Sequence, residues 1–125
     1  MSALSRILRA GESNTLSFWC PACDSAHSIR HGVDGWTWNG NAEKPTFTPS
    51  ILVRNGHYAP HYEAGDACWC SFNAEQVANG KEPTTYGCAI CHSFVKDGLI
   101  EFCGDSTHAL AGQTAPLAEW PGDVE

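Results

Sequence analysis

Two Cys-x-x-Cys pairs, Cys20–Cys23 and Cys88–Cys91, constrain the fold of this chain more than any other feature. Two residues between thiolates let one tight turn direct both sulfurs at a single ion. Two such pairs supply the four ligands of a tetrahedral zinc site. A site of this kind is closed to substrate, so the spacing predicts a structural Zn²⁺ that joins two distant segments of the chain.

The ligand set has alternatives. His27 follows Cys23 in the same segment, and His92 is adjacent to Cys91. Either histidine can replace one thiolate in a site of three cysteines and one histidine. The other reading places each histidine in a strand, where it donates to a backbone carbonyl.

Cys68 and Cys70 flank Trp69 and form a weaker motif. In a strand, residues two apart share a face, so both sulfurs can reach one ion. The pair can complete a second site, or it packs as small hydrophobic side chains beside Trp69, and a further alternative is that Cys70 enters the main site. The candidate additional ligands of a second site are His57, His61 and Cys103.

Short alternating segments predict a mostly β fold. Residues 15–20 alternate apolar and polar side chains, and residues 92–96 and 99–103 flank Asp97-Gly98, which is a hairpin signal. Pro49 lies in a β-rich segment, where it requires an edge position or a bulge. We therefore expect a curved antiparallel sheet with a zinc-ribbon-like four-cysteine site and one or two short helices.

The chain divides into three parts. Residues 1–14 are expected to be a flexible lead-in, 15–120 a single zinc-binding β domain, and 121–125 a tail. Residues 55–87 show no clear periodicity and predict a long excursion with a short helix at Asn73–Asn79. A second short helix is expected to begin at Asp105 or Ser106 and to end at Gly112.

Charge and targeting signals exclude several functions. Seven Lys and Arg residues stand against fourteen Asp and Glu residues, giving a net charge of −7, which disfavours nucleic-acid binding through a basic face. No apolar run is long enough to span a membrane, and residues 1–11 do not form a signal peptide. We therefore expect a cytoplasmic protein whose cysteines are metal ligands rather than disulfides.

Three polar residues are candidates for catalysis. Asp105 and His108 are close in sequence and, at a helix start, face the same way. Together with His92 they can form an acid–base or metal-dependent site. The alternative is that Asp105 caps a helix and His108 lies in its first turn. The sequence contains no His-Glu-x-x-His, phosphate-binding or Gly-x-Ser-x-Gly motif.

Several stretches together resemble a known family. They are residues 18–23 with His27, 45–51, 68–70, 91–95 with Asp97-Gly98, and 107–114. The chain resembles small cysteine-rich zinc-binding proteins of unknown function from tailed phages and prophages of proteobacteria, often labelled "ammonia monooxygenase". That family has a cysteine where this chain has Ser106.

The resemblance implies a phage origin and action inside a bacterial host cell. Together with the closed metal site and acidic surface, it predicts a phage accessory protein that engages a host protein and inhibits a defence system. The alternatives are a zinc-dependent hydrolase using His92, Asp105 and His108, and a minor structural phage component. The oligomeric state stays open.

Overall fold

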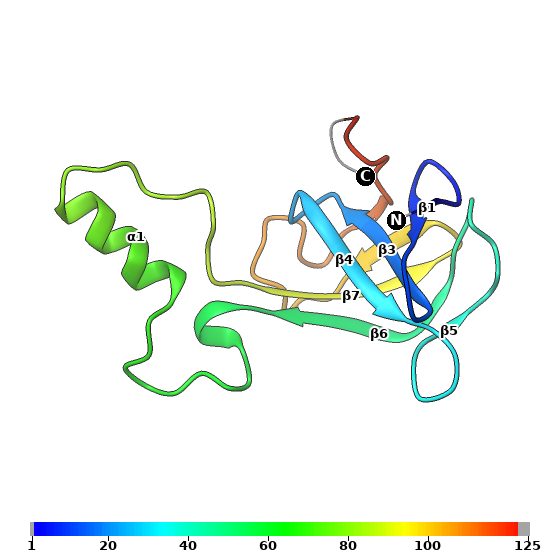
Figure 1. Cartoon of the computed structure of the whole chain (residues 1–125), viewed down its shortest axis with the longest axis horizontal. Coiled ribbons are helices and arrows are strands. Elements are labelled where there is room, and N and C mark those ends of the chain that lie inside the picture. Colours follow the sequence, from blue (N-terminus) through cyan, green and yellow to red (C-terminus); the bar gives the residue numbers. More distant parts are fainter. Residues whose placement is uncertain (1, 123–125) are drawn as a thin grey trace.

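The computed structural model describes residues 2–122 and consists mainly of two antiparallel sheets (Figure 1). The first has the strand order β1-β2-β3-β4: Ser2–Ala3, Leu8–Ala10, Thr15–Cys20 and Ser25–Arg30. The second has the order β5-β6-β7-β8-β9: Thr37–Trp38, Phe47–Arg54, Ile90–Lys96, Leu99–Phe102 and Thr114–Pro116. The predicted mostly β, antiparallel class is confirmed, with two sheets where one was expected.

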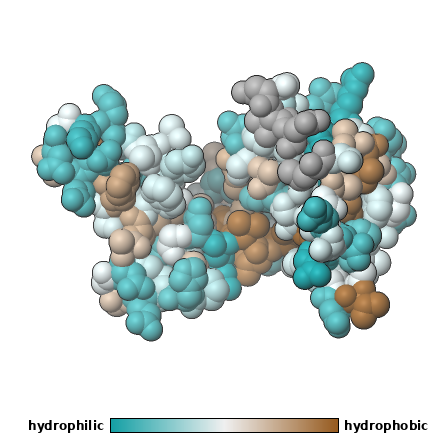
Figure 2. Space-filling view, viewed as in Figure 1, coloured by the Kyte–Doolittle hydropathy of each residue, from teal (hydrophilic) through white to brown (hydrophobic). Residues whose placement is uncertain are grey.

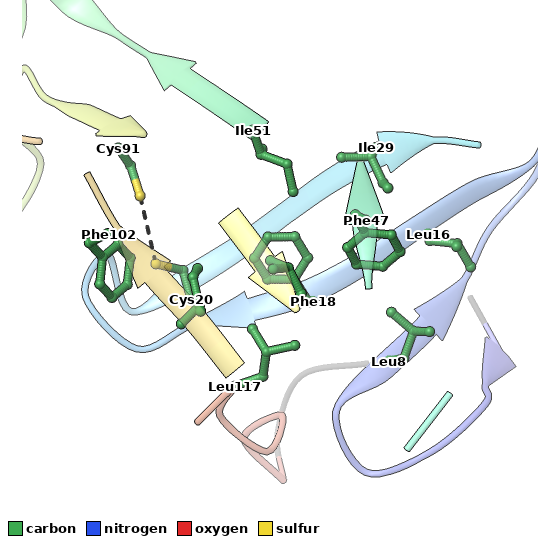
Figure 3. Packing of buried hydrophobic residues seen from close by; sticks show 12 residues of the cluster. Leu8, Leu16, Phe18, Cys20, Ile29, Phe47, Ile51, Cys91, Phe102 and Leu117 are labelled. Atoms are coloured by element: carbon green, nitrogen blue, oxygen red, sulfur yellow. Dashed lines mark hydrogen bonds between the residues drawn. The ribbon is translucent and has the colours of Figure 1, made fainter. Parts of the chain in front are cut away.

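One hydrophobic core lies between the sheets (Figure 3). Phe18 of β3 is fully buried, and its ring stacks on that of Phe47 of β6 with the ring centroids 6.1 Å apart. On β7 the inward residues alternate with outward ones, so Cys91 and Val95 face the core while His92 and Phe94 face outward. Further core side chains are Leu8, Leu16, Ile29, Ile51, Ile100, Phe102 and Leu117.

The N-terminal segment belongs to the first sheet. Leu8 is 0% exposed and pairs with Phe18 in the β2–β3 ladder, so the described part of residues 1–14 differs from the expected flexible lead-in. Burial of an apolar side chain stabilises this strand in its place. At the other end, Trp120 is 7% exposed, and the last part of the expected tail, 123–125, lies outside the described residues.

Strand β6 contains the bulge predicted from Pro49. Its register against β7 shifts between Phe47, which pairs with Val95, and Ile51, which pairs with Ser93. Proline has no backbone N–H to give to a ladder, so a proline inside a sheet requires such an interruption. The bulge places residues 48–50 outside the pairing with β7.

The hairpin predicted at Asp97-Gly98 is confirmed. It joins β7 and β8, and both central residues have positive φ, 51° and 79°. The short helix expected from residue 105 is absent: residues 103–113 form turns and bends. Neither expected cap acts as one, because the Asp105 carboxylate contacts the His92 ring and Ser106 Oγ bonds to the His92 backbone.

Residues 55–89 form an arm that extends away from the two sheets (Figure 1). Its base is closed by Asn55, whose N–H donates to the carbonyl of Ala89 and whose Oδ1 accepts from the Ala89 N–H. The arm carries the 3-10 helix η1, Gly56–Tyr58, and helix α1, Trp69–Ala78. No residue of α1 is buried, and the surface of the arm is mostly hydrophilic in Figure 2. Within residues 2–122, no helix is long and apolar enough to cross a membrane.

Candidate active site and metal clusters

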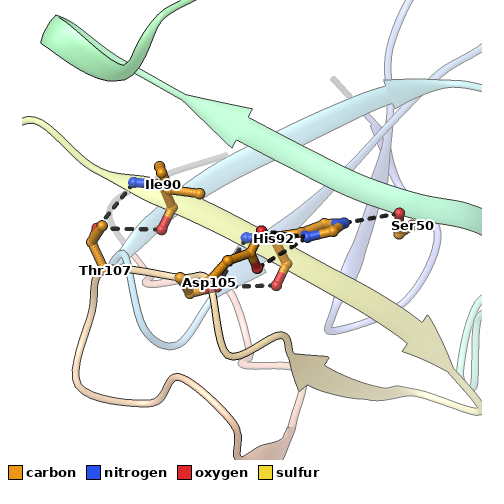
Figure 4. Close-up of polar contacts among 6 residues, drawn as sticks. Ser50, Ile90, His92, Asp105 and Thr107 are labelled. Atoms are coloured by element: carbon orange, nitrogen blue, oxygen red, sulfur yellow. Dashed lines mark hydrogen bonds and ion pairs between the residues drawn. The ribbon is translucent and has the colours of Figure 1, made fainter.

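Three polar side chains from distant parts of the chain form a hydrogen-bonded line on the outer face of the second sheet (Figure 4). The Oγ of Ser50 lies 3.0 Å from Nε2 of His92. The Nδ1 of His92 lies 3.1 Å from each carboxylate oxygen of Asp105. A hydroxyl, an imidazole and a carboxylate in this order are the parts of a Ser-His-Asp triad, which is recognised by geometry rather than by sequence position.

The hydrogen-bond roles follow from the carboxylate. An ionised Asp105 only accepts, so Nδ1 of His92 carries the proton and Nε2 is the acceptor. The Ser50 hydroxyl then donates to Nε2, which is the arrangement that allows His92 to remove its proton. The His92 side chain is 26% exposed and that of Asp105 is 60% exposed, so the site is open to a substrate from solvent.

The loop after β8 is fastened to β7, and this positions Asp105. The N–H of Cys103 donates to the carbonyl of His92 over 2.8 Å. Ser106 Oγ accepts from the His92 N–H, and Thr107 Oγ1 accepts from the Ile90 N–H. These bonds continue the edge of β7 where β8 has ended, so Asp105 is presented beside the imidazole.

Ser50 is the functional residue that sequence analysis missed. The β6 bulge frees it from the ladder with β7, and its carbonyl accepts from the Trp36 indole N–H over 3.3 Å. Bulges often lie next to active sites, where they redirect a side chain. The serine directly after Pro49, the residue that predicts the bulge, was therefore the signal in the sequence for this candidate.

A groove of about 480 Å³ begins beside the triad on the same face of the sheet. The ring of Phe94 lies 6.3 Å from that of His92, and Phe94 and Leu99 line the groove with half-exposed apolar surface. Lys96 adds one positive charge to the lining, and Asp97 and Glu101 add two negative charges. The groove therefore offers an apolar floor with charged edges, and Phe94 is the lining residue that lies beside His92.

A first metal-type cluster joins the two sheets. Cys20, Cys23 and His27 come from β3, the following turn and β4, while Cys91 comes from β7. Their donor atoms all lie within 4.8 Å of one another, and the Cys20 and Cys91 sulfurs are 4.0 Å apart (Figure 3). Cys20, His27 and Cys91 are buried.

The chemistry of this first cluster fits Zn²⁺. Three thiols and one imidazole are a tetrahedral zinc set. The Cys23 N–H donates to the Cys20 sulfur over 3.4 Å, as turn amides do in zinc knuckles. Within residues 2–122, the buried Nε2 of His27 has no hydrogen-bond partner. Hydrogen bonds among the three sulfurs lower the pKa of Cys20 and raise the pKa of Cys23 and of Cys91.

A second cluster lies in the arm and consists of His57, Cys68, Cys70 and Cys88. Its donor atoms also lie within 4.8 Å of one another. The predicted grouping of Cys88 with the other three cysteines therefore differs from the structure, because Cys88 stands at the arm while Cys91 faces the core. His27 takes the fourth position of the first cluster, as the alternative with three cysteines and one histidine had it. Cys68 and Cys70 lie with His57, as the alternative of a second site had it.

The remaining candidate residues, His108, His61 and Cys103, belong neither to the line of Ser50, His92 and Asp105 nor to a four-residue cluster. His108 accepts from the Leu110 N–H through Nδ1, and its ring packs edge-on against Phe102 with the centroids 4.5 Å apart. His61 is exposed and belongs to neither four-residue cluster. The Cys103 sulfur lies within 4.8 Å of a donor atom of His92 and of Asp105, and burial, with the charges of Asp105 and Glu101, raises the pKa of its thiol.

Fold and site thus define a two-sheet β protein with a Ser-His-Asp constellation on one outer face. The family model for BubE, described as bacterial ubiquitination-like system serine protease, matches residues 3–103. The chain belongs to the BubE family. The match includes Ser50 and His92, and Asp105 follows just after its end. No curated protein and no solved structure matches the chain.

The family match corrects the resemblance to phage and prophage proteins, which is wrong. The expected role as a phage accessory protein that inhibits a defence system is wrong with it. The same holds for the two alternatives, a structural phage component and a zinc-dependent hydrolase, because the family is described as a serine protease. The resemblance rested on short stretches of sequence, several of which contain cysteines or histidines of the metal-type clusters, and such residues carry little information about the reaction.

Proposed function

We propose that this protein is a serine peptidase in which Ser50 is the nucleophile, His92 the general base and Asp105 the group that orients His92. The observation that carries the proposal is the unbroken line of hydrogen bonds from Ser50 Oγ through His92 to Asp105. The family description supports the same reaction.

The reaction proceeds in two steps. Ser50 Oγ attacks the carbonyl carbon of the scissile amide while Nε2 of His92 takes the hydroxyl proton. The imidazolium then gives this proton to the leaving amine nitrogen, and the C–N bond breaks to leave an acyl ester on Ser50. In the second step His92 removes a proton from water, which attacks the ester carbonyl. The imidazolium then returns that proton to Ser50 Oγ as the ester C–O bond breaks and the acid is released. Asp105 stabilises the imidazolium by accepting from Nδ1 throughout.

The substrate is a polypeptide that lies in the groove next to the triad. An apolar side chain of the substrate packs on Phe94, whose ring lies 6.3 Å from that of His92, and on Leu99, which lines the same groove. The family description supports a protein of a ubiquitination-like system as the substrate. In this proposal the protein partner of the chain is its substrate, the polypeptide that is cleaved.

The metal in the first cluster is Zn²⁺ with a structural role. Cys20, Cys23, His27 and Cys91 are the ligands, which leaves no open position for water or substrate. Cys91 and His92 are neighbours on β7 and face opposite sides of the sheet, so the cluster that fixes this strand also fixes the general base. Reduced thiols are required, which favours the cytoplasm.

A fluorophosphonate probe tests the nucleophile. We expect the purified protein to be labelled on Ser50, because an activated serine hydroxyl attacks phosphorus as it attacks a carbonyl. Ser50→Ala should lose the labelling while keeping its melting temperature. Ser25→Ala, which removes an exposed hydroxyl from β4, should be labelled like the wild type. Undiminished labelling of Ser50→Ala would contradict the proposal.

A further inference from the structure

The packing contacts of the arm do not account for the stability of helix α1. Helix α1 has no buried residue, and Phe72, Val77 and Tyr86 are 44%, 59% and 64% exposed. Isolated helices of this length are marginal in water, because packing normally stabilises them. The aromatic contacts of Trp69 with Phe72 and Tyr86 lie at the surface and give the arm only a small apolar cluster.

We infer that the arm holds a second, independent Zn²⁺ through His57, Cys68, Cys70 and Cys88, and that this ion fixes α1 to the base of the arm. The four residues come from three separate segments: η1, the start of α1, and the returning chain just before β7. An ion bound there joins these segments where no hydrophobic core does.

The distances suit a tetrahedral site. Around a Zn²⁺ with Zn–S bonds of about 2.3 Å, sulfurs lie about 3.8 Å apart. Here the Cys70 sulfur and Nδ1 of His57 are 3.8 Å apart, and all four donor atoms lie within 4.8 Å of one another. A small contraction brings them to ligand positions, and three sulfurs with one imidazole favour Zn²⁺ over harder cations.

Backbone groups around the sulfurs match those of a metal site. The His57 N–H donates to the Cys88 sulfur over 3.5 Å. Cys68 is the N-cap of α1, and its sulfur accepts from the N–H of Ser71. Such N–H bonds spread the charge of ligating thiolates. Burial by itself raises the pKa of Cys88, but the hydrogen bonds to its sulfur outweigh that effect and lower the pKa to about 6.

Gly56 gives independent evidence that the chain at the start of η1 leaves room for the Cys88 sulfur. A Cβ at Gly56 would collide with that sulfur, and the residue has φ +59°. Any side chain here pushes Cys88 away from His57. Gly80, in the same arm, has φ +73°, and a Cβ added there would meet no atom within 4 Å. The two glycines therefore differ in the space around them but not in backbone conformation.

Zinc content measured by mass spectrometry on the purified full chain tests the inference. We expect two equivalents in the wild type and one in Cys70→Ser. Gly56→Ala, which removes no ligand, should also lose one equivalent, whereas Gly80→Ala should keep both. Cys103→Ser should keep both as well, because Cys103 belongs to neither four-residue cluster. Replacement by Co²⁺ should give tetrahedral thiolate absorption that halves in Cys70→Ser.

Limited proteolysis adds a readout that does not depend on activity. Loss of the arm ion should open residues 59–87 to cleavage in Cys70→Ser, while the two sheets stay intact. One equivalent of zinc in the wild type, with unchanged zinc in Cys70→Ser, would overturn the inference. So would an arm that is cleaved equally fast in Cys70→Ser and the wild type. Because the triad contributes no ligand, the fluorophosphonate result stands or falls separately.

Discussion

The carboxylate of Asp105 is exposed, and its exposure affects its contribution to stability differently from its proposed contribution to catalysis. The Asp105 side chain is 60% exposed, yet both of its oxygens lie 3.1 Å from Nδ1 of His92. Solvent screens an exposed ion pair, so its contribution to stability is small. Its contribution to catalysis is geometric, because it selects the tautomer of His92 that accepts the Ser50 proton.

Asp105→Asn should therefore lower kcat with little change in KM. The amide can hold His92 in the other tautomer, with Nδ1 as acceptor, and we expect a loss of about 10²–10⁴-fold. Steady-state kinetics on a peptide substrate measure the effect. Asp34→Asn replaces an exposed loop carboxylate, and His108→Ala a histidine outside the triad, so both should keep kcat. Equal losses in Asp105→Asn and His108→Ala would contradict the assignment.

At the scale of elements, strands β7 and β8 carry both the general base and the proposed groove. Phe94 follows His92 on the outward face of β7, and Leu99 lies across on β8. The strand pair thus places apolar surface beside His92, the proposed general base.

Leu99→Glu should raise KM by roughly tenfold with kcat little changed, because an apolar contact is worth about that much in binding. Val33→Glu is the matched control, since Val33 is 96% exposed and lies outside the groove. An unchanged KM in Leu99→Glu would show that the substrate takes another path.

The turn between these strands has a strict conformational requirement. Gly98 has φ +79°, and an added Cβ would meet the Lys44 backbone at 3.3 Å. Gly98→Val should reduce the free energy of unfolding by at least about 1 kcal/mol, because a β-branched residue is strained at positive φ. Chemical denaturation measures this loss. Equal stability of the variant and the wild type would argue against the type I′ turn.

At the scale of the whole molecule, the first metal cluster connects the two sheets. Cys20 and Cys23 lie beside the first sheet, and Cys91 lies in the second. The core already holds the sheets together through contacts such as that of Phe18 with Phe47. Zn²⁺ bound by these residues would add a cross-link between the two sheets.

Cys20→Ser should remove this zinc and lower the melting temperature sharply or unfold the protein. Structural zinc contributes about 10–16 kcal/mol in small domains, against a typical stability of about 5–15 kcal/mol. Calorimetry with zinc analysis checks the expectation, and Cys103→Ser is the matched thiol control. A Cys20→Ser protein with full zinc content and an unchanged melting curve would contradict it.

Local patterns in the sequence determined the class of fold and the ability to bind metal. Alternation in β3, the Asp97-Gly98 turn and the Pro49 bulge each depend on backbone conformations that a few neighbouring residues dictate. The polar side chains of His92 and Asp105 also marked them as candidates for catalysis, but the sequence grouped them with His108 and not with Ser50. Spacing alone suggested that Cys88 and Cys91 share an ion.

Tertiary structure decided how these residues group. In an extended chain, residues three apart are separated by about 10 Å and face opposite sides, so Cys88 and Cys91 bind one ion only if the chain turns between them. Here it runs straight into β7, and the two sulfurs join different clusters. Ser50 and His92 are 42 positions apart and meet only because β6 pairs with β7 around a bulge. No local pattern encodes that contact, since pairing of distant strands is set by the packing of the whole core.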